Sequence, residues 1–143
     1  MSPSRGMADV ADLIERLAHS DRLERVHAAV DLVRLGRAGR RLEDALAAAL
    51  KDERPVVRKM AALVLGDLAP DSRKAVPALA DALRDVEEGV RRRAAVALGQ
   101  FGAAATAAIP ALRAALADAD EGVRSFAATS LALVEPADRA RAA

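Results

Sequence analysis

Apolar residues recur along the chain at a constant spacing of 33 residues. One such series is Leu13, Leu46, Leu79 and Leu112, and a second is Leu17, Leu50, Leu83 and Leu116. No insertion interrupts either series. A fixed period of about 20 to 50 residues is typical of repeat proteins, so the pattern predicts four copies of one structural unit.

Each unit contains two stretches in which apolar residues follow a helical spacing. In the third unit, Leu79 and Leu83 mark one apolar face, and Val90, Ala94 and Leu98 mark a second one. Steps of three and four residues place side chains on the same face of an α-helix. The pattern predicts first helices at 9–19, 42–51, 75–84 and 108–117, and second helices at 22–35, 55–68, 88–101 and 121–134.

The predicted fold is all-α, a right-handed α-solenoid of about four two-helix repeats with a period of 33 residues. The repeat domain is expected to cover 9–136. It lies between a flexible N-terminus at 1–8 and a tail at 137–143, with repeats at 9–36, 42–69, 75–102 and 108–135.

Four glycines indicate where the second helices end and where they pack. Gly36 and Gly102 are expected to end second helices, as glycine commonly does. Gly66 and Gly99 lie inside second helices, where glycine costs about 1 kcal/mol of helix propensity. That cost predicts close packing of these positions against a neighbouring helix.

The third unit reads AVPALADALRDVEEGVRRRAAVALGQFG over 75–102. It resembles a HEAT-like repeat of the kind also found in phycobilisome lyases, and 42–70 and 108–136 resemble further copies. The resemblance implies a helical solenoid for nearly the whole chain. The first unit departs from the pattern, because His19 and Glu24 stand where the other units have Asp and Val. An N-terminal capping repeat would differ in this way.

Aspartate and arginine recur six residues apart, on either side of the turn between the two helices of a unit. The pairs are Asp52 with Arg58, Asp85 with Arg91, and Asp118 with Arg124. A catalytic carboxylate beside an electrophilic arginine is one interpretation. Repetition in three units favours a structural role, and the HEAT-like resemblance implies that these residues form a ladder that ties adjacent repeats together.

The sequence offers no residues for catalysis. It contains no cysteine, which excludes disulfides and thiolate metal sites. His19 and His27 have no converging partners for metal or acid–base work. The acidic run of Asp118, Asp120 and Glu121 lacks the spacing of an EF-hand, and no phosphate loop or nucleophile elbow is present. We predict a non-enzymatic protein with no catalytic residues, no cofactor and no metal.

Composition narrows the environment of the protein. Its 143 residues are 52% hydrophobic and 30% charged, which is typical of a globular domain. A net charge of +1 gives no overall attraction to nucleic acid or to anionic membranes. The chain has no signal-peptide-like start and no run of 18 apolar residues, so we expect a cytoplasmic protein that does not contact a membrane.

The second helices are predicted to carry the binding surface, because in a HEAT-type stack they line the concave side. Positions that do not face the core vary between units, whereas the core positions repeat. This variation predicts a scaffold that binds a helix or peptide of another protein. The predicted partner-binding residues are Lys59, Met60, Leu63, Arg92, Arg93, Val96, Phe126 and Thr129.

Two other functions are less favoured. A nucleic-acid-associated protein would contact phosphates through the basic run at 91–93 and through linker cations, which are Arg37, Arg40, Arg41, Arg73 and Lys74. Such binding also requires stacking residues, and the only aromatic residues are Phe101 and Phe126. A chromophore lyase, which only the resemblance implies, would need a pocket for a large pigment, and this alanine-rich chain gives little sign of one.

The edges and the C-terminal end carry two further expectations. The turns within units are acidic and the linkers between units are basic, which predicts a rod with two differently charged edges. Leu116, Leu131 and Val134 are expected to be uncovered on the last hairpin. This predicts self-association through that end or attachment to a further domain.

Overall fold

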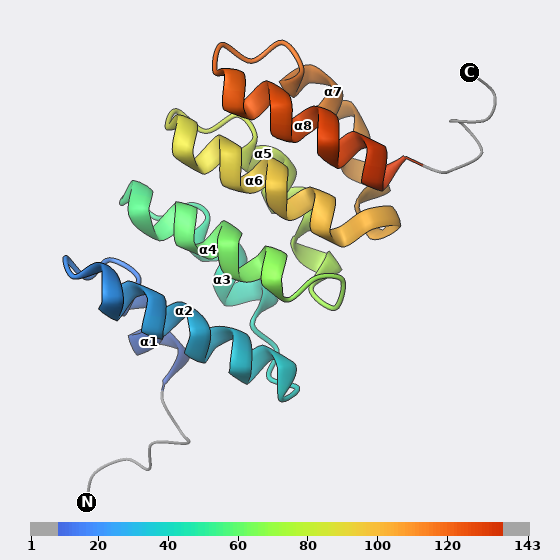
Figure 1. Cartoon of the computed structure of the whole chain (residues 1–143). Coiled ribbons are helices and arrows are strands. Elements are labelled where there is room, and N and C mark those ends of the chain that lie inside the picture. Colours follow the sequence, from blue (N-terminus) through green and yellow to red (C-terminus); the bar gives the residue numbers. More distant parts are fainter. Residues whose placement is uncertain (1–8, 136–143) are drawn as a thin grey trace, which may run out of the picture.

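The computed structural model describes residues 9–135, which form four helical hairpins and contain no strand. Figure 1 shows the second helices of the hairpins side by side in one layer, with the first helices behind them. The first helices are α1 (Val10–Arg16), α3 (Glu43–Ala49), α5 (Val76–Ala82) and α7 (Ile109–Ala115). The second helices are α2 (Arg22–Arg37), α4 (Pro55–Asp67), α6 (Glu88–Phe101) and α8 (Glu121–Val134). The predicted all-α solenoid is confirmed.

The second helices lie within two residues of their predicted bounds, whereas the first helices are shorter than predicted, with seven residues each. After each first helix the backbone tightens into hydrogen bonds between residues three apart. The Ala18 N–H, for example, donates to the Glu15 carbonyl over 3.1 Å. Apolar residues continue through this tighter turn, so their spacing extends past the α-helix. The predicted segments 1–8 and 137–143 lie outside the described residues.

The linkers contain structure that the sequence did not predict. Two 3₁₀ segments, Arg73–Ala75 and Gly102–Ala108, lead into α5 and α7. Gly102 ends α6 with a φ of +56°, as expected. The expectation for Gly36 is wrong, because α2 continues to Arg37 and the chain turns at Gly39, with a φ of +95°. Gly36 lies against Leu68 instead, and a Cβ there would come within 2.6 Å of Leu68 Cδ2, at the end of that side chain.

Close packing at the two internal glycines is confirmed. A Cβ on Gly66 would lie 3.1 Å from Ala97 Cα of α6, and a Cβ on Gly99 would lie 3.2 Å from Ser130 Cα of α8. Missing side chains at these positions let α4, α6 and α8 approach one another closely. The buried Ser130 hydroxyl uses this proximity to donate a 2.6 Å hydrogen bond to the Ala95 carbonyl of α6. First and second helices share one continuous core, to which the first helices contribute the repeated Leu46, Leu79 and Leu112.

The last hairpin covers most of the apolar surface that was expected to be open. Leu131 and Val134 are buried, at 8% and 1% exposure, because they pack within the domain core. Leu116, at the end of α7, is exposed, as expected, and Leu133 on α8 is exposed as well. The predicted uncovered surface at this end is therefore smaller than the sequence indicated.

One helical run within residues 9–135, Glu88–Ala115, meets the length and composition of a membrane span, with a window of mean hydropathy 1.5. Half of that window is buried in the domain. The run is also interrupted, because Gly102 reverses the backbone between α6 and α7. Burial in the repeat core accounts for the apolar character of this run.

Candidate protein-binding face

Two arginines connect consecutive repeats on the turn side of the solenoid. Arg58 Nε and Nη2 donate to the two carboxylate oxygens of Asp85 over 2.8 and 3.0 Å, and Arg91 pairs with Asp118 over 2.9 and 3.2 Å. Each aspartate is thus held by the arginine of the preceding repeat. Arg124 makes no ion pair within residues 9–135.

The same arginines also fix their own turns. Arg58 Nη1 donates to the Asp52 and Glu53 carbonyls, and Arg91 and Arg124 repeat this arrangement in their units. In each turn the aspartate side chain accepts an N–H from the residue two positions later. His19 takes this position in the first unit and accepts the Asp21 N–H through Nδ1 over 3.0 Å. These contacts give the repeated residues and His19 structural roles.

A third cation, Arg92, is held by an aspartate of the next repeat. Arg92 Nε and Nη2 each donate to a carboxylate oxygen of Asp120 over 2.7 Å. The hydrogen bonds from Arg92 hold the pKa of Asp120 well below its ordinary value. Asp120 also caps α8 by accepting the Val123 N–H over 2.9 Å. Arg92 is therefore committed within the fold, although the sequence placed it on the binding surface.

The junction between the first and second repeats differs from the others. Arg25 donates to the His19 and Ser20 carbonyls but forms no ion pair within the described residues. Asp52 instead bonds to Arg54, over 2.9 and 3.0 Å, and Arg54 also bonds to Glu15. Hydrogen bonds from Arg54 lower the pKa of both carboxyl groups. This junction therefore lacks the arginine–aspartate pair that joins the later repeats.

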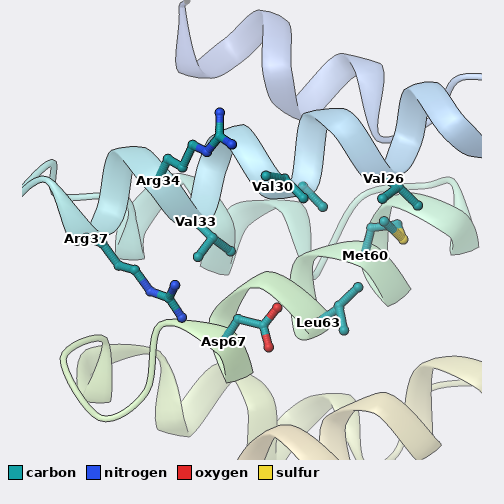
Figure 2. A pocket seen from close by; sticks show the side chains of 9 residues that line it. Val26, Val30, Val33, Arg34, Arg37, Met60, Leu63 and Asp67 are labelled. Carbon is teal, nitrogen blue, oxygen red and sulfur yellow. The ribbon is translucent and has the colours of Figure 1, made fainter.

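A groove lies at this junction, between α2 and α4 (Figure 2). The α2–α4 groove has a volume of about 460 Å³. Its lining is mostly apolar and ends in charged residues toward the linker edge; it consists of Val26, Ala29, Val30, Val33, Arg34, Arg37, Met60, Leu63 and Asp67. Figure 2 shows Val30, Val33 and Leu63 between the two helices, with Arg34 and Arg37 on α2 and Asp67 on α4.

A second, smaller hollow of about 240 Å³ lies on the same face, over α4, α6 and α8. It is lined by Lys59, Gly89, Arg92, Arg93, Val96 and Phe126. Phe126, one of the two aromatic residues in the sequence, is 42% exposed. We call this hollow the Phe126 groove.

The eight predicted partner-binding residues have different environments. Lys59, Arg93, Phe126 and Thr129 are exposed, and Leu63 and Val96 are half-buried. The prediction that Met60 is exposed on the binding surface is wrong. Its side chain is 8% exposed and belongs to the core, although it also lines the α2–α4 groove. The prediction of these eight residues also omitted α2, which contributes Val26, Val30, Arg34 and Arg37. Exposed valines at two adjacent turns of α2 were the available signal.

Comparison with known proteins identifies the family. The family model that describes HEAT repeats matches residues 10–99 and 76–143 of this sequence. The chain is a HEAT-repeat protein. This match is to HEAT repeats in general and gives no support to a specific likeness with phycobilisome lyases.

Two solved structures resemble this HEAT-repeat protein. One is an engineered protein, with a TM-score of 0.65 and 26% identity over 88% of this chain and 62% of the other. Another is human deoxyhypusine hydroxylase in complex with glycerol, with a TM-score of 0.64 and 34% identity over 87% of this chain and 43% of the other. The chain thus spans less than two thirds of either structure. A search of curated proteins found no match.

Proposed function

We propose that this HEAT-repeat protein is a non-enzymatic scaffold that binds a helix or peptide of another protein on the face formed by its second helices. The observation that carries the proposal is the α2–α4 groove. It combines an apolar floor, including Val26 and Val30 at about two-fifths exposure, with charged residues at one end. Apolar grooves with a polar border are the surfaces on which amphipathic helices and peptides bind.

The likeness to a hydroxylase does not change this proposal. Among residues 9–135 no three His, Asp or Glu side chains come together in a possible metal site. The least exposed carboxylates, Asp85, Asp118 and Asp120, each bond to an arginine of the preceding repeat. An arginine partner keeps a carboxylate ionised and occupies its lone pairs, which favours a structural role.

Nucleic acid is the less favoured partner for a related reason. Of the basic run at 91–93, Arg91 is bonded to Asp118 and Arg92 to Asp120, and only Arg93 is exposed on the face without an ion pair among described residues. Phosphate binding depends on cations that are free to replace counterions. The other exposed cations that line the grooves are Lys59 at the Phe126 groove and Arg34 and Arg37 at the α2–α4 groove, whose lining is mostly apolar.

Affinity capture with matched variants tests the proposal. The face variant carries Val30→Glu and Phe126→Ser, and the control carries Val86→Ser, which removes an equally apolar side chain, 88% exposed, from a turn. We expect the wild type and the control to capture the same protein and the face variant to lose it, with circular dichroism and melting temperature unchanged in all three. Equal capture by the face variant contradicts the proposal. Capture that disappears after nuclease treatment supports nucleic-acid binding instead.

A further inference from the structure

We propose that the α2–α4 groove binds a short amphipathic segment of another protein in one direction, with the apolar side chains of the segment in the groove and its carboxylates at Arg34 and Arg37. This inference rests on the proposed scaffold function and names the site and the chemistry of the partner.

We attribute the groove to one difference in sequence between α2 and the later second helices. Val33 occupies the position in α2 that Gly66 has in α4 and Gly99 in α6. At those two glycines the next helix approaches so closely that a Cβ would contact its backbone. A valine side chain cannot be accommodated at that distance, and α2 packs on α4 much more sparsely than α4 on α6 or α6 on α8. The first junction is therefore held apart, and it also lacks the arginine–aspartate pair.

The floor of the groove carries apolar side chains at two exposed positions, one of which is polar in the other repeats. Val26 and Val30 are 41% and 42% exposed. The equivalents of Val26 in later repeats are Lys59, Arg92 and Ser125. Exposed β-branched side chains beside a hollow gain free energy when a partner covers them, at about 25 cal/mol for each Å² of apolar surface removed from water. This surface favours an apolar partner.

The end of the groove at the linker edge is positively charged. Arg34 is 78% exposed and lies 3.9 Å from Asp31, and Arg37 is exposed with no ion pair among the described residues. Arg40 and Arg41 follow in the adjoining linker and are also exposed. Asp67 is the only acidic residue that lines the groove. Guanidinium groups bind carboxylates through paired, charge-assisted hydrogen bonds, so an acidic partner end is expected here.

The direction and length of the partner follow from this arrangement. The apolar floor begins at Val26 and the cations end at Arg37, which is about 16 Å along α2 at about 1.5 Å per residue. A helical segment of about three turns, with apolar residues three and four apart and Asp or Glu after the last of them along the groove, matches this length. The reversed segment would place its carboxylates over the valines.

Peptide selection tests this inference. Random peptides of about 15 residues, displayed on phage, are selected on the immobilised full chain. One enriched peptide is then synthesised with a fluorescent label, and its Kd is measured by anisotropy. We expect enriched peptides with an apolar stretch and an acidic end. The Arg34→Glu/Arg37→Glu variant should bind the peptide at least about tenfold more weakly, and replacing the acidic residues of the peptide with Lys should restore binding to that variant.

Two variants complete the design. Arg73→Glu/Lys74→Glu makes the same change of charge at a linker away from the groove and should leave the Kd nearly unchanged. Val30→Glu should weaken binding of the peptide because it places a charge among the apolar side chains of the groove. Equal loss in both charge variants, or binding without charge rescue, overturns the inference.

The outcomes also separate this inference from the proposed function. Peptides that lose binding with Phe126→Ser but not with Val30→Glu retain the scaffold function and overturn the assignment to the α2–α4 groove. Failure to enrich any peptide contradicts both. A dimer in sedimentation that Val30→Glu dissociates would identify a second copy of this chain as the occupant and would overturn the proposed partner.

Discussion

At the residue scale, Arg58 and Arg91 each make two kinds of contact. One edge of the guanidinium bonds to carbonyls of its own turn, and the other bonds to an aspartate of the next repeat. A planar group with five donors can satisfy both sets at once, which lysine cannot do. This geometry explains why Arg58 and Arg91 recur at the same position.

Replacing Asp85 with Asn should destabilise the protein. The Asp85 and Arg58 side chains are each only 11% exposed, and the variant leaves the guanidinium without a charged partner. Removing one member of a buried ion pair costs about 3–5 kcal/mol. We expect a loss toward the lower end of this range, measured as the free energy of unfolding in urea. Glu87→Gln in the same turn is the control, and an equal effect of the two substitutions would contradict the role of the pair.

Gly99→Ala tests the close approach of α6 and α8. Alanine favours a helix over glycine by about 1 kcal/mol. Here its Cβ would meet Ser130, whose Oγ is held by the Ala95 carbonyl and whose Cα lies 3.2 Å away. Overpacking costs about 1–3 kcal/mol, so we expect a net loss of about 1 kcal/mol in thermal or urea unfolding.

Gly89→Ala is the matched control for this substitution on the same helix. Its Cβ would meet only Lys59 Cδ, at 3.5 Å. The helix propensity should therefore dominate, and we expect this variant to be as stable as the wild type or more stable. A Gly99→Ala variant that gains stability to the same extent would show that the two helices can separate without cost.

At the element scale, α4, α6 and α8 form a closely packed group, and α2 joins it through the open junction. Stability in repeat proteins is approximately a sum of repeat and interface contributions. The first junction packs sparsely, and the ion pair that crosses it, between Arg54 and Glu15, is exposed, so this junction should contribute less. The first hairpin should therefore open more readily than the last one, although both lie at ends of the described solenoid.

Hydrogen exchange measures this difference. Amides in the middle of α2 should exchange faster than those in the middle of α8 under native conditions, because local opening requires less free energy there. The comparison with α8 controls for the position of both helices at an end. Equal protection of α2 and α8 would show that the α2–α4 junction is as strong as the others.

At the scale of the whole molecule, the charges are arranged along two edges. Turns within repeats lie along one edge of the solenoid and linkers along the other (Figure 1). Many of the turn carboxylates are bonded to arginines, including Asp52, Asp85 and Asp118. The linker cations are exposed. One edge of the described solenoid therefore carries carboxylates of which many are paired with arginines, and the other carries exposed cations.

Acid should destabilise the fold through the paired carboxylates. The pKa of Asp120 is lowered by Arg92, and that of Asp52 by Arg54. Burial raises the pKa of Asp118, but hydrogen bonds from the Asp120 N–H and Arg91 outweigh it and lower the pKa overall. A carboxylate whose pKa is lowered by folding stabilises the folded state fully at a pH above its ordinary pKa of 3.8. This stabilisation is lost as the pH falls toward the pKa in the folded state.

Urea unfolding at several pH values tests this expectation. The midpoint for the wild type should be steady near neutral pH and should fall below about pH 4. Asp120→Asn cannot titrate and should reduce the slope in that range, while its stability at neutral pH is lower. A midpoint that rises on acidification, or an unchanged slope in the variant, would contradict the assigned shifts.

The sequence alone determined the repeat, the helices and much of the packing. Its period is uninterrupted, so apolar spacing and turn residues agree in every unit, and local preferences and the global fold coincide. Because the helix bounds were clear, Gly66 and Gly99 could be recognised as internal glycines, and their cost in helix propensity predicted close approach of a neighbouring helix. Gly36 was misread, because a glycine that lies inside a helix against Leu68 looks the same in a sequence as one that ends a helix.

The tertiary structure decided which surface residues are available for a partner. Met60 and Arg92 occupy variable positions, yet one is buried and the other is bonded to Asp120. The exposure of a side chain depends on the distance to the next helix. Its pairing depends on which residue of the neighbouring repeat faces it. The spacing of residues within one repeat encodes neither. At the first junction α2 packs sparsely on α4, and the α2–α4 groove follows from this placement of the two helices, which spacing within one repeat does not give.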